Sequence, residues 1–379
     1  MTTGEIQKPK QSFLSRILFW VNIAFAASLL LSNLAASVSP QKNWWLAMFG
    51  LGFGIIAFVN FLFLVYYTLR RKRKLLLSLV ALLLVINKLF GIYEIRFSKP
   101  PELKNAMKVM TYNVRLFDLY NWYHNFETRK KIFDMLRKQS PDIVCFQEYF
   151  SSERHDYDYN NADTLRTVLS CPYAHIYYTV NLHGNKDHWG IATYSRYPII
   201  NRKVVLFDSK RRRAFIYSDV VNGSDTIRVI NVHLESIGFK AEDYRFVENL
   251  GEEDQEELQG AMNIGRRLKR AFVRRSSQAE RLHEEIKNSP YPVIVCGDFN
   301  DTPTSYTYKT VSDGMKDAFR VSGSGSGKTY LGVFPSFRID YILHSDRLQS
   351  SGYTKIEEPL SDHYPVYCYI SPGKRNDNP

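Results

Sequence analysis

Polar side chains of the kinds that hold cations and phosphates end several β-like runs in the second part of the chain. The runs carry the motifs Met-Thr-Tyr-Asn, Phe-Gln-Glu, Asn-Val-His-Leu, Gly-Asp-Phe-Asn, Arg-Ile-Asp-Tyr-Ile and Ser-Asp-His, which place, in order, Asn113, Glu148, His233, Asp298, Asn300, Asp340, Asp362 and His363. Carboxylate and amide oxygens suit hard divalent cations, and a histidine beside a phosphate can orient or protonate it. These residue types predict metal-assisted chemistry on a phosphoester.

The acidic residues divide into two roles. Glu148 and Asp298 each follow an apolar run, so both should project from strand ends at one edge of a sheet, where α/β folds gather their sites. Mg²⁺ usually takes one or two protein carboxylates and completes its shell with water and substrate phosphate. Glu148, supported by Asn113, fits that role. Asp298, Asn300 and Asp362 are candidates to contact the attacking water, the phosphate or a second metal, although each alone is more typical of a turn.

Two histidines are candidates for proton transfer. Asp340 lies on an expected strand and His363 in the loop before the last strand, so an Asp340–His363 dyad forms if those strands are neighbours. His233 interrupts an otherwise apolar strand, which a purely structural histidine also does. Alone it would be assigned to the core; together with the other motifs it is predicted to act in the site.

The ordered motifs resemble those of the endonuclease/exonuclease/phosphatase superfamily, whose members include DNase I, abasic-site endonucleases, neutral sphingomyelinases and inositol polyphosphate 5-phosphatases. The resemblance covers residues 106–372. It implies an α/β fold, a four-layer sandwich of two mixed sheets face to face with helices outside. It also implies a catalytic set of His233, Asp298, Asn300, Asp340 and His363, and a Mg²⁺ or Mn²⁺ site made by Asn113, Glu148 and Asp362.

The roles that this resemblance implies differ from residue to residue. Asp298 and Asn300 would hold the nucleophile and the phosphate, and His233 would stabilise the phosphoryl oxygens or assist the leaving group. Asp340 would orient His363 as the general base. In a further segment that resembles a family strand, Ile191 stands where the family often has asparagine, so no phosphate contact is expected there.

The residues between these motifs alternate between strand-like and helix-like patterns. A helix is expected over Thr128–Lys138, where apolar residues share one face and Ser140-Pro141 follows. The strands are expected at Lys108–Val114, Ile143–Gln147, Ile191–Ser195, Ile227–Leu234, Val293–Asp298, Ile339–Leu343 and Pro365–Ile370. This β-α-β rhythm predicts an α/β domain around a sheet.

The first 97 residues have a different composition. Residues 17–38 and 44–69 contain no charged side chain, and Leu75–Tyr93 contains only Lys88. Because about 20 apolar residues cross a hydrocarbon core, residues 1–97 are predicted to be a membrane anchor of about three transmembrane helices. Residues 98–105 would be a linker and residues 373–379 a polar tail.

The loop charges predict an orientation for that anchor. Arg70–Lys74 is a run of five basic residues between the second and third apolar segments, and such runs stay cytoplasmic. Three crossings would then place the catalytic domain on the periplasmic side of the inner membrane. If Leu75–Tyr93 does not span, the domain faces the cytoplasm instead.

Composition leaves the substrate open. The formal net charge of +12 fits either a surface that binds polyanions or positive-inside charge with an ordinary surface. A nuclease would use Lys210–Arg213, and also Arg266–Arg275, to hold backbone phosphates. A phospholipid or sphingomyelin phosphodiesterase or phosphatase would instead use Trp122, Tyr123 and Phe126 to reach headgroups, although core positions are slightly favoured for these aromatics. A binding module without catalysis is a third alternative, disfavoured because no ligand is missing.

Three further features point away from other site types. The four cysteines are too scattered for a disulfide framework or a Cys-rich metal site, and Cys145 and Cys296 are expected to pack as small hydrophobic residues. Ser322–Thr329 imitates a phosphate-binding P-loop but lacks its first glycine and is predicted to be a flexible loop. Residues 240–275 are highly charged and are predicted to form one or two exposed helices.

Overall fold

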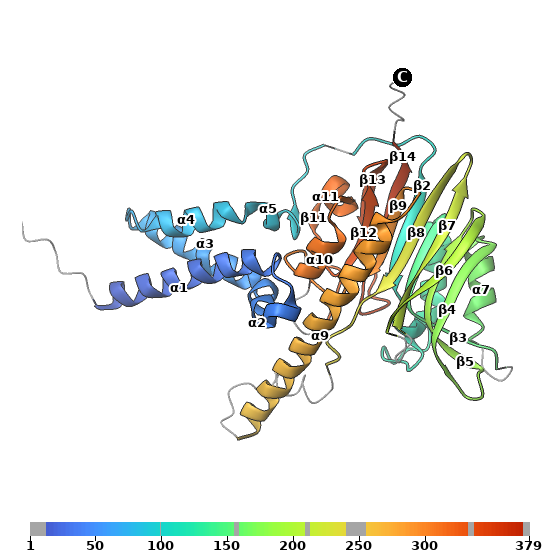
Figure 1. Cartoon of the computed structure of the whole chain (residues 1–379), viewed down its shortest axis with the longest axis horizontal. Coiled ribbons are helices and arrows are strands. Elements are labelled where there is room, and N and C mark those ends of the chain that lie inside the picture. Colours follow the sequence, from blue (N-terminus) through green and yellow to red (C-terminus); the bar gives the residue numbers. More distant parts are fainter. Residues whose placement is uncertain are drawn as a thin grey trace, which may run out of the picture.

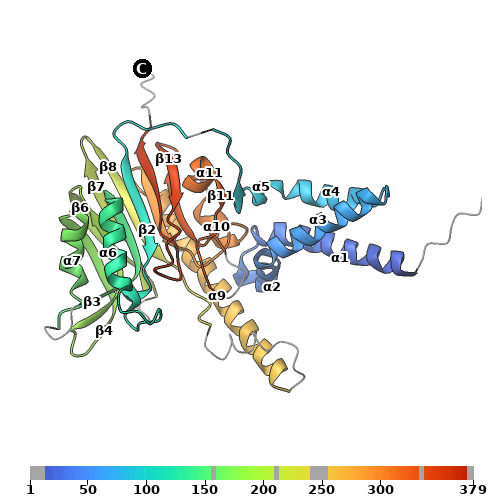
Figure 2. The same ribbon diagram turned by 180° about the vertical axis from the view of Figure 1, so that it is seen from behind.

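The computed structural model describes residues 13–98, 100–154, 159–208, 213–239, 255–332 and 337–373. These form an N-terminal bundle of apolar helices beside a β-sandwich, with the first β-strand of the sandwich following the linker (Figures 1 and 2).

Two six-stranded mixed sheets make up the sandwich. The first has the strand order β13 (Leu348–Lys355), β14 (Val366–Pro372), β2 (Met107–Asn113), β3 (Ile143–Ser152), β5 (Asp187–Ser195) and β4 (Tyr173–Leu182). The second has the order β10 (Met315–Asp317), β12 (Asp340–Ser345), β9 (Val293–Asp298), β8 (Asp225–His233), β7 (Arg213–Asn222) and β6 (Ile199–Asp208). Each sheet contains one parallel pair, β2–β3 in the first and β8–β9 in the second.

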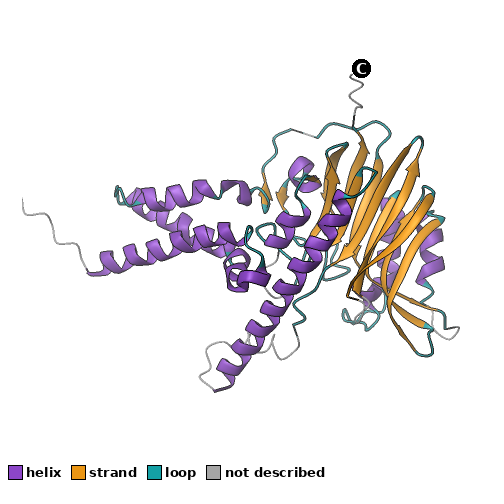
Figure 3. Cartoon of the chain, in the orientation of Figure 1, coloured by secondary structure: helices purple, strands orange, loops and turns teal. Residues whose placement is uncertain are grey.

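Helices cover the outer face of each sheet (Figure 3). Apolar residues of α6 (Thr128–Gln139) and α7 (Asn161–Leu169) pack against the first sheet, and those of α9 (Gln255–Lys287) and α10 (Tyr306–Val311) against the second. Between the sheets lies a third buried cluster, which contains Cys145, Cys296 and Cys368 as small apolar side chains. The expected mixed α/β sandwich is therefore observed.

Most of the expected elements are found with shifts of a few residues at their ends. The structure adds β4, β6, β7 and β13, which lack a motif to mark them. The charged stretch forms one long helix, α9, over its described part, while residues 240–254 lie outside the described residues.

The apolar segments form the helices α1 (Phe13–Ala35), α2 (Pro40–Leu51), α3 (Phe53–Leu69), α4 (Leu75–Leu84) and α5 (Ile86–Leu89). Of the described helices, α1 alone is long and apolar enough to cross a membrane, and α2 with α3, bent by 50°, would add a second span if the pair counts as one. The expectation of about three spanning helices is thus met only in part.

The third apolar segment is interrupted at Val85, which has φ −114° and ψ 7° and separates α4 from α5. The turn brings the ammonium of Lys88 to the carbonyl oxygens of Ser32 and Asn33, at 3.2 and 3.0 Å, near the C-terminal end of α1. A cation is favourable there because the last carbonyls of a helix carry partial negative charge. Lys88 therefore joins α5 to the end of α1.

The expectation of a flexible Ser322–Thr329 loop is wrong. Within it, β11 (Gly325–Ser326) pairs with β1 (Tyr93–Glu94), the strand that follows the helical bundle. At its end, Thr329 is fully buried, and its hydroxyl accepts hydrogen bonds from the backbone N–H groups of Ile339 and Asp340. The segment links the bundle to the strand that carries Asp340.

Candidate active site

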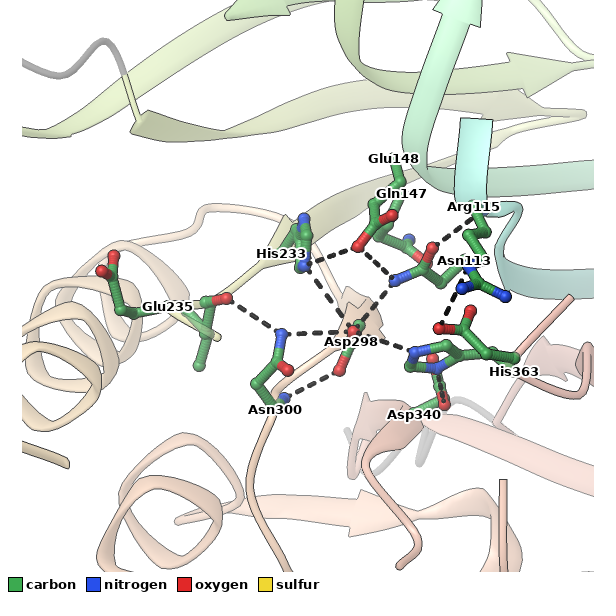
Figure 4. A network of polar contacts seen from close by, with 12 residues as sticks. Asn113, Arg115, Gln147, Glu148, His233, Glu235, Asp298, Asn300, Asp340 and His363 are labelled. Carbon is green, nitrogen blue, oxygen red and sulfur yellow. Dashed lines mark hydrogen bonds and ion pairs between the residues drawn. The ribbon is translucent and has the colours of Figure 1, made fainter. Parts of the chain in front are cut away.

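The register of three neighbouring strands brings together residues from distant motifs. His233 on β8 lies opposite Asp298 on β9, which lies opposite Asp340 on β12. In the facing sheet, Asn113 ends β2 beside the end of the first part of β3, where Glu148 follows. Figure 4 shows Asn113, His233 and His363 turned toward Asp298 from different strands and loops.

Asp298 is the centre of this arrangement. It is buried, and its carboxylate accepts hydrogen bonds from the backbone N–H of Asn300 at 2.8 Å and the side-chain amide of Asn113 at 3.1 Å. The amide of Asn300 bonds to both Asp298 and the carbonyl oxygen of Leu234. Burial is the main cause that raises the pKa of Asp298 to about 6.

The predicted dyad is present. Nδ1 of His363 lies 2.9 Å from Oδ2 of Asp340, and its Nε2 lies 3.8 Å from Oδ2 of Asp298. Burial lowers the pKa of His363, but the carboxylates of Asp340 and Asp298 outweigh it and raise that pKa to about 10. Asp340 therefore both orients the ring and stabilises its protonated form.

Glu148 is aimed by an irregularity of its strand. The β3–β5 register shifts between Phe146 and Tyr149, and Glu148 adopts a left-handed φ of 48° there. Its carboxylate lies 3.4 Å from the amide of Asn113, and 37% of the Glu148 side chain is exposed. Burial, followed by repulsion from Asp362, raises its pKa. A divalent cation bound between these two carboxylates would relieve their repulsion, and the exposure of Glu148 leaves the position accessible to it.

His233 lies between the two groups of acids. Its Nε2 is 3.7 Å from Asp298 and 3.9 Å from Glu148, and has no hydrogen-bond partner among the described residues. Burial lowers its pKa, which favours the neutral form of the ring. A neutral imidazole with a free nitrogen can contact a phosphoryl oxygen or a leaving group.

Arg115 is a site residue that the sequence reasoning missed. Its guanidinium lies 3.6 Å from Asp362 and 4.3 Å from the ring centroid of Trp122. It begins a turn in which all four residues of Arg115–Asp118 have positive φ. Residues other than glycine rarely adopt a positive φ, and backbone strain of this kind is concentrated at functional sites. The only signal in the sequence was an arginine two residues after Asn113.

Buried contacts hold the strained turn and the His363 loop in place. Phe117 packs against Phe133, Phe146 and Tyr149, and Asp118 accepts the backbone N–H of Trp122 at 2.7 Å. On the other side, the hydroxyl of Ser361 donates to the carbonyl oxygen of Asn113 at 2.8 Å. Together these contacts fix the distance between β2 and the dyad.

An amide network beneath the site joins the two sheets. The side-chain amide of Gln147 donates to Oδ1 of Asn231 at 2.7 Å, and Asn231 donates to the carbonyl oxygens of Phe146 and Ala192. Both amides belong to motifs in the sequence, but their bridging role appears only when the sheets face one another. Buried networks with satisfied partners fix one arrangement of a core.

Two expectations about the surroundings need correction. Of Trp122, Tyr123 and Phe126, for which core positions were slightly favoured, Phe126 is 87% exposed, Trp122 is also exposed and Tyr123 is half-buried. Of Lys210–Arg213, residues 210–212 lie outside the described residues. Arg213, expected to hold backbone phosphates, instead lies 2.5 Å from the carboxylate of Glu235. The same carboxylate also pairs with Arg274.

The donor set fits a divalent cation in two adjoining places. Ligand atoms of Asp298, Asp340 and His363 lie within 4.8 Å of one another, and Oδ1 of Asp340 lacks a hydrogen-bond partner among the described residues. Glu148 and Asn113 form a more open, oxygen-rich position beside them. Because Mg²⁺ prefers oxygen ligands and keeps several waters, the Glu148 position suits it better than the buried trio, whose imidazole already bonds to Asp340.

Two protein-family models match the chain. Residues 110–363 match the model of the endonuclease/exonuclease/phosphatase family, and residues 15–91 match a model described as a domain of unknown function. No curated protein matches the chain.

Several solved structures have a similar fold. An endonuclease/exonuclease/phosphatase from Beutenbergia cavernae aligns with a TM-score of 0.51 and 18% identity, over 71% of this chain and 72% of that one. A family protein from Bacteroides vulgatus aligns with a TM-score of 0.48 and 19% identity, over 71% and 100%. The human Nocturnin catalytic domain aligns with a TM-score of 0.49 and 19% identity, over 71% and 94%.

Proposed function

The chain belongs to the endonuclease/exonuclease/phosphatase family, whose members are usually hydrolases of phosphoester bonds, and from that premise we propose that it is a Mg²⁺- or Mn²⁺-dependent phosphoester hydrolase tethered to a membrane. The observation that carries the proposal is the convergence of Asp298, Asp340 and His363 on one strand edge opposite Glu148.

The metal would be held by Glu148 and Asn113, with Asp362 close by. The repulsion between Asp362 and Glu148 supports that position of the metal, since a cation between two carboxylates removes their repulsion. The bound cation supplies Lewis-acid polarisation of the phosphoryl group. The remaining steps belong to side chains of the protein.

His363 is the general base for the attacking water. Its Nε2 faces Asp298, which would orient the water, while Asp340 holds Nδ1 and stabilises the proton that the ring takes up. The raised pKa of His363 means that the ring must first lose its proton.

His233 and Asn300 complete the reaction on the other side of Asp298. The neutral imidazole of His233 is positioned to stabilise a phosphoryl oxygen or assist the leaving group. Asn300 has a left-handed φ of 52°, and its amide is already tied to Asp298 and Leu234. Asn300 therefore holds Asp298 in place and presents its remaining surface to the phosphate.

Membrane tethering is supported by the outward surface of the helical bundle. Only 22% of the most apolar stretch of α1 is buried, and large apolar side chains of α3, among them Phe58 at 60% exposure, also face outward. A helix in the core of a soluble protein would hide such side chains, and exposed apolar surfaces of this extent mark a lipid or protein contact.

The direction of the helices supports the orientation proposed from charge. α1 runs toward the sandwich, α3 runs away from it, and α4 with α5 returns to it, so that Arg70–Lys74 lies at the far end of the bundle (Figure 1). With that basic turn in the cytoplasm, three crossings leave the catalytic domain on the periplasmic side of the inner membrane. The inward bonding of Lys88 makes the third crossing compatible with its single charge.

The substrate is proposed to be a phosphodiester of nucleic-acid type, because the guanidinium of Arg115 lies beside Asp362 in the candidate site. Phospholipid or sphingomyelin headgroups are the second candidate, favoured by the exposed Trp122 and Phe126. The two can be separated by salt, since binding of a nucleic acid through arginines and lysines weakens steeply as salt rises.

The decisive experiment uses the full chain in lipid nanodiscs. Turnover of bis(p-nitrophenyl) phosphate, single-stranded and duplex DNA, RNA, and vesicles of phosphatidylcholine or sphingomyelin is measured with Mg²⁺, with Mn²⁺ and with EDTA. Metal-dependent cleavage of one class supports the proposal and selects the substrate. Cleavage that persists in EDTA contradicts metal dependence.

Glu148→Gln tests the metal position directly. It should weaken Mn²⁺ binding by at least about 10–100-fold, as loss of a ligand or its support does, and this is read from Mn²⁺ electron paramagnetic resonance as well as from turnover. Glu102→Gln in the exposed linker is the matched control and should bind Mn²⁺ as the parent does. Unchanged Mn²⁺ affinity in Glu148→Gln would remove Glu148 from the metal site.

A further inference from the structure

The fold divides five of the basic residues of α9 into two groups, while a further one, Arg267, donates to the carbonyl oxygen of Gly238. Residues 266–275 contain six arginines or lysines and no acidic residue. Arg274 and Arg275 turn toward the sandwich, where they pair with Glu235 at 2.7 Å and Asp301 at 3.1 Å. Their charges are therefore satisfied inside the protein.

The second group, Arg266, Lys269 and Arg270, is exposed on the part of the helix that precedes Arg274. None of the three is paired with a carboxylate of the described residues; Arg266 reaches the side-chain oxygen of Asn263 instead. Three adjacent cations that pair with no carboxylate in the described part of the chain favour an anionic partner from outside it.

The neighbour of this basic face is the short helix α2. The ammonium of Lys269 lies 5.6 Å from the ring centroid of Trp44, and Trp45 beside it is 47% exposed. The N-terminal end of α2 is tied to α9 by Gln41, whose amide donates to Glu280 at 3.0 Å. Tryptophans are enriched at the level where hydrocarbon meets headgroups, and lysines and arginines lie just outside it.

The position of the two helices fits that level. α2 lies where the apolar bundle meets the sandwich, bent by 50° from α3, and α9 extends past it alongside the base of the bundle (Figures 1 and 2). A bilayer around the bundle would therefore bring its headgroups to Trp45 and to the exposed face of α9.

We propose that Arg266, Lys269 and Arg270 of α9, together with Trp44 and Trp45 of α2, form a docking surface for anionic phospholipid headgroups of the bilayer that holds the bundle. This surface rests on the proposed membrane insertion. Attraction of these three cations to an anionic bilayer holds the catalytic domain in one orientation on the membrane. A nucleic-acid backbone is the alternative polyanion and is an outcome of the test.

The test places an environment-sensitive fluorophore on the full chain at Met262→Cys, an exposed position one turn before Arg266. The four native cysteines are buried, so the new thiol is labelled selectively. In nanodiscs that contain phosphatidylglycerol the emission should shift to the blue and be quenched by lipids that carry a nitroxide. In nanodiscs of phosphatidylcholine alone the shift should be small.

Charge reversal separates the proposed surface from a general effect. The triple variant Arg266→Glu, Lys269→Glu and Arg270→Glu should return the emission to its value in water, and about 1 M salt, where the screening length is about 3 Å, should do the same. Lys287→Glu, an exposed lysine at the other end of α9, is the matched control and should leave the shift unchanged.

The outcomes distinguish this inference from the proposed function. A chain that does not co-purify with nanodiscs contradicts membrane tethering. A chain that does co-purify but whose label stays in water in both lipids, or is insensitive to the triple reversal, overturns the docking surface alone. A label that responds to a single-stranded oligonucleotide in detergent but not to phosphatidylglycerol assigns the surface to nucleic acid and overturns the proposal as well.

Discussion

The active-site edge of the sandwich and the seam of the helical bundle both bury polar side chains, but of different kinds. At the sandwich edge, Asp298, Asp340 and His363 are ionisable and lie within 4.8 Å of one another. In the bundle seam, Ser78 donates to Asn22 at 2.7 Å, and Asn60 donates to the carbonyl oxygen of Phe25 at 3.0 Å, so the buried groups are neutral.

The difference fits the roles that we propose for the two regions. Ionisable groups close together shift one another's pKa, which chemistry at neutral pH requires and which a rigid pair of sheets can sustain. Neutral amides and hydroxyls only join helices, at little desolvation cost in an apolar surrounding. Substitutions should therefore reduce activity at the edge and affect only helix association in the seam.

The largest effect is expected for His363→Asn. Loss of a positioned general base should reduce the turnover number about 10²–10⁴-fold while the fold remains, since asparagine can still accept or donate a hydrogen bond near Asp340. Steady-state kinetics with Mg²⁺ measure the loss, and near-ultraviolet circular dichroism checks the fold. His124→Asn, at an exposed position of the aromatic loop, is the control. A loss below about tenfold would remove His363 from the chemistry.

The next largest effect should come from the contact between the two regions. Arg338, two residues before Asp340, is buried, pairs with Asp317 at 2.7 Å and donates to the carbonyl oxygen of Gly91 at 2.9 Å. Arg338→Met leaves Asp317 buried without its cation and should cost about 3–5 kcal/mol of unfolding free energy. Urea unfolding in detergent measures it.

The exposed Arg320 provides the matched control for that substitution. Its ion pair with Glu94 is long, at 4.0 Å, and exposed pairs contribute at most about 1 kcal/mol. Equal losses for Arg338→Met and Arg320→Met would mean that the buried pair does not hold the bundle and the site together.

A pH dependence of stability should also distinguish the edge from the seam. The pKa of His363 is about 10 in the folded protein and about 6.5 in an unfolded chain. Its contribution to stability is therefore complete below about pH 6.5 and is lost as the pH rises toward 10. The raised pKa of Asp298 also makes stability fall as the pH rises, but in a lower window, between about 3.8 and about 6.

Denaturant unfolding of the metal-free protein between pH 6.5 and 10 measures this decline. The comparison is with His363→Asn, which lacks the titrating ring and should lose less stability over the same range. Parallel curves for the two proteins would show that Asp340 and Asp298 do not support a protonated His363.

The smallest effect is expected in the seam. Ser78→Ala removes the bond to Asn22, and bonds of this kind between helices in lipid contribute about 0.6 kcal/mol on average. Ser28→Ala, where an exposed hydroxyl bonds only to the carbonyl oxygen of Ala24 in the same helix, is the control. Thermal unfolding in nanodiscs compares them, and a change in turnover of either variant would contradict the separation of the two regions.

Local patterns were sufficient for most of the sandwich. A strand alternates and a helix repeats along a few residues, so β2, β9 and α6 could be predicted within a few residues from the chain alone. The residue types at the strand ends, among them Glu148, Asp298 and His363, were equally visible, because chemistry on phosphates needs those types.

Contacts between remote segments were not visible in this way. The left-handed turn that aims Arg115, the burial of Thr329 and the bond from Lys88 to the end of α1 each depend on a partner that is distant in the chain. The exposure of Phe126 was mispredicted for the same reason, since an aromatic residue in a loop is core or surface according to what folds over it. The types and the order of the site residues are thus properties of the sequence. The distances between those residues and their charge states arise from the packing of the two sheets against one another. The division of the basic residues of α9 into those paired with carboxylates and those exposed arises from the packing of that helix on the sandwich and the bundle.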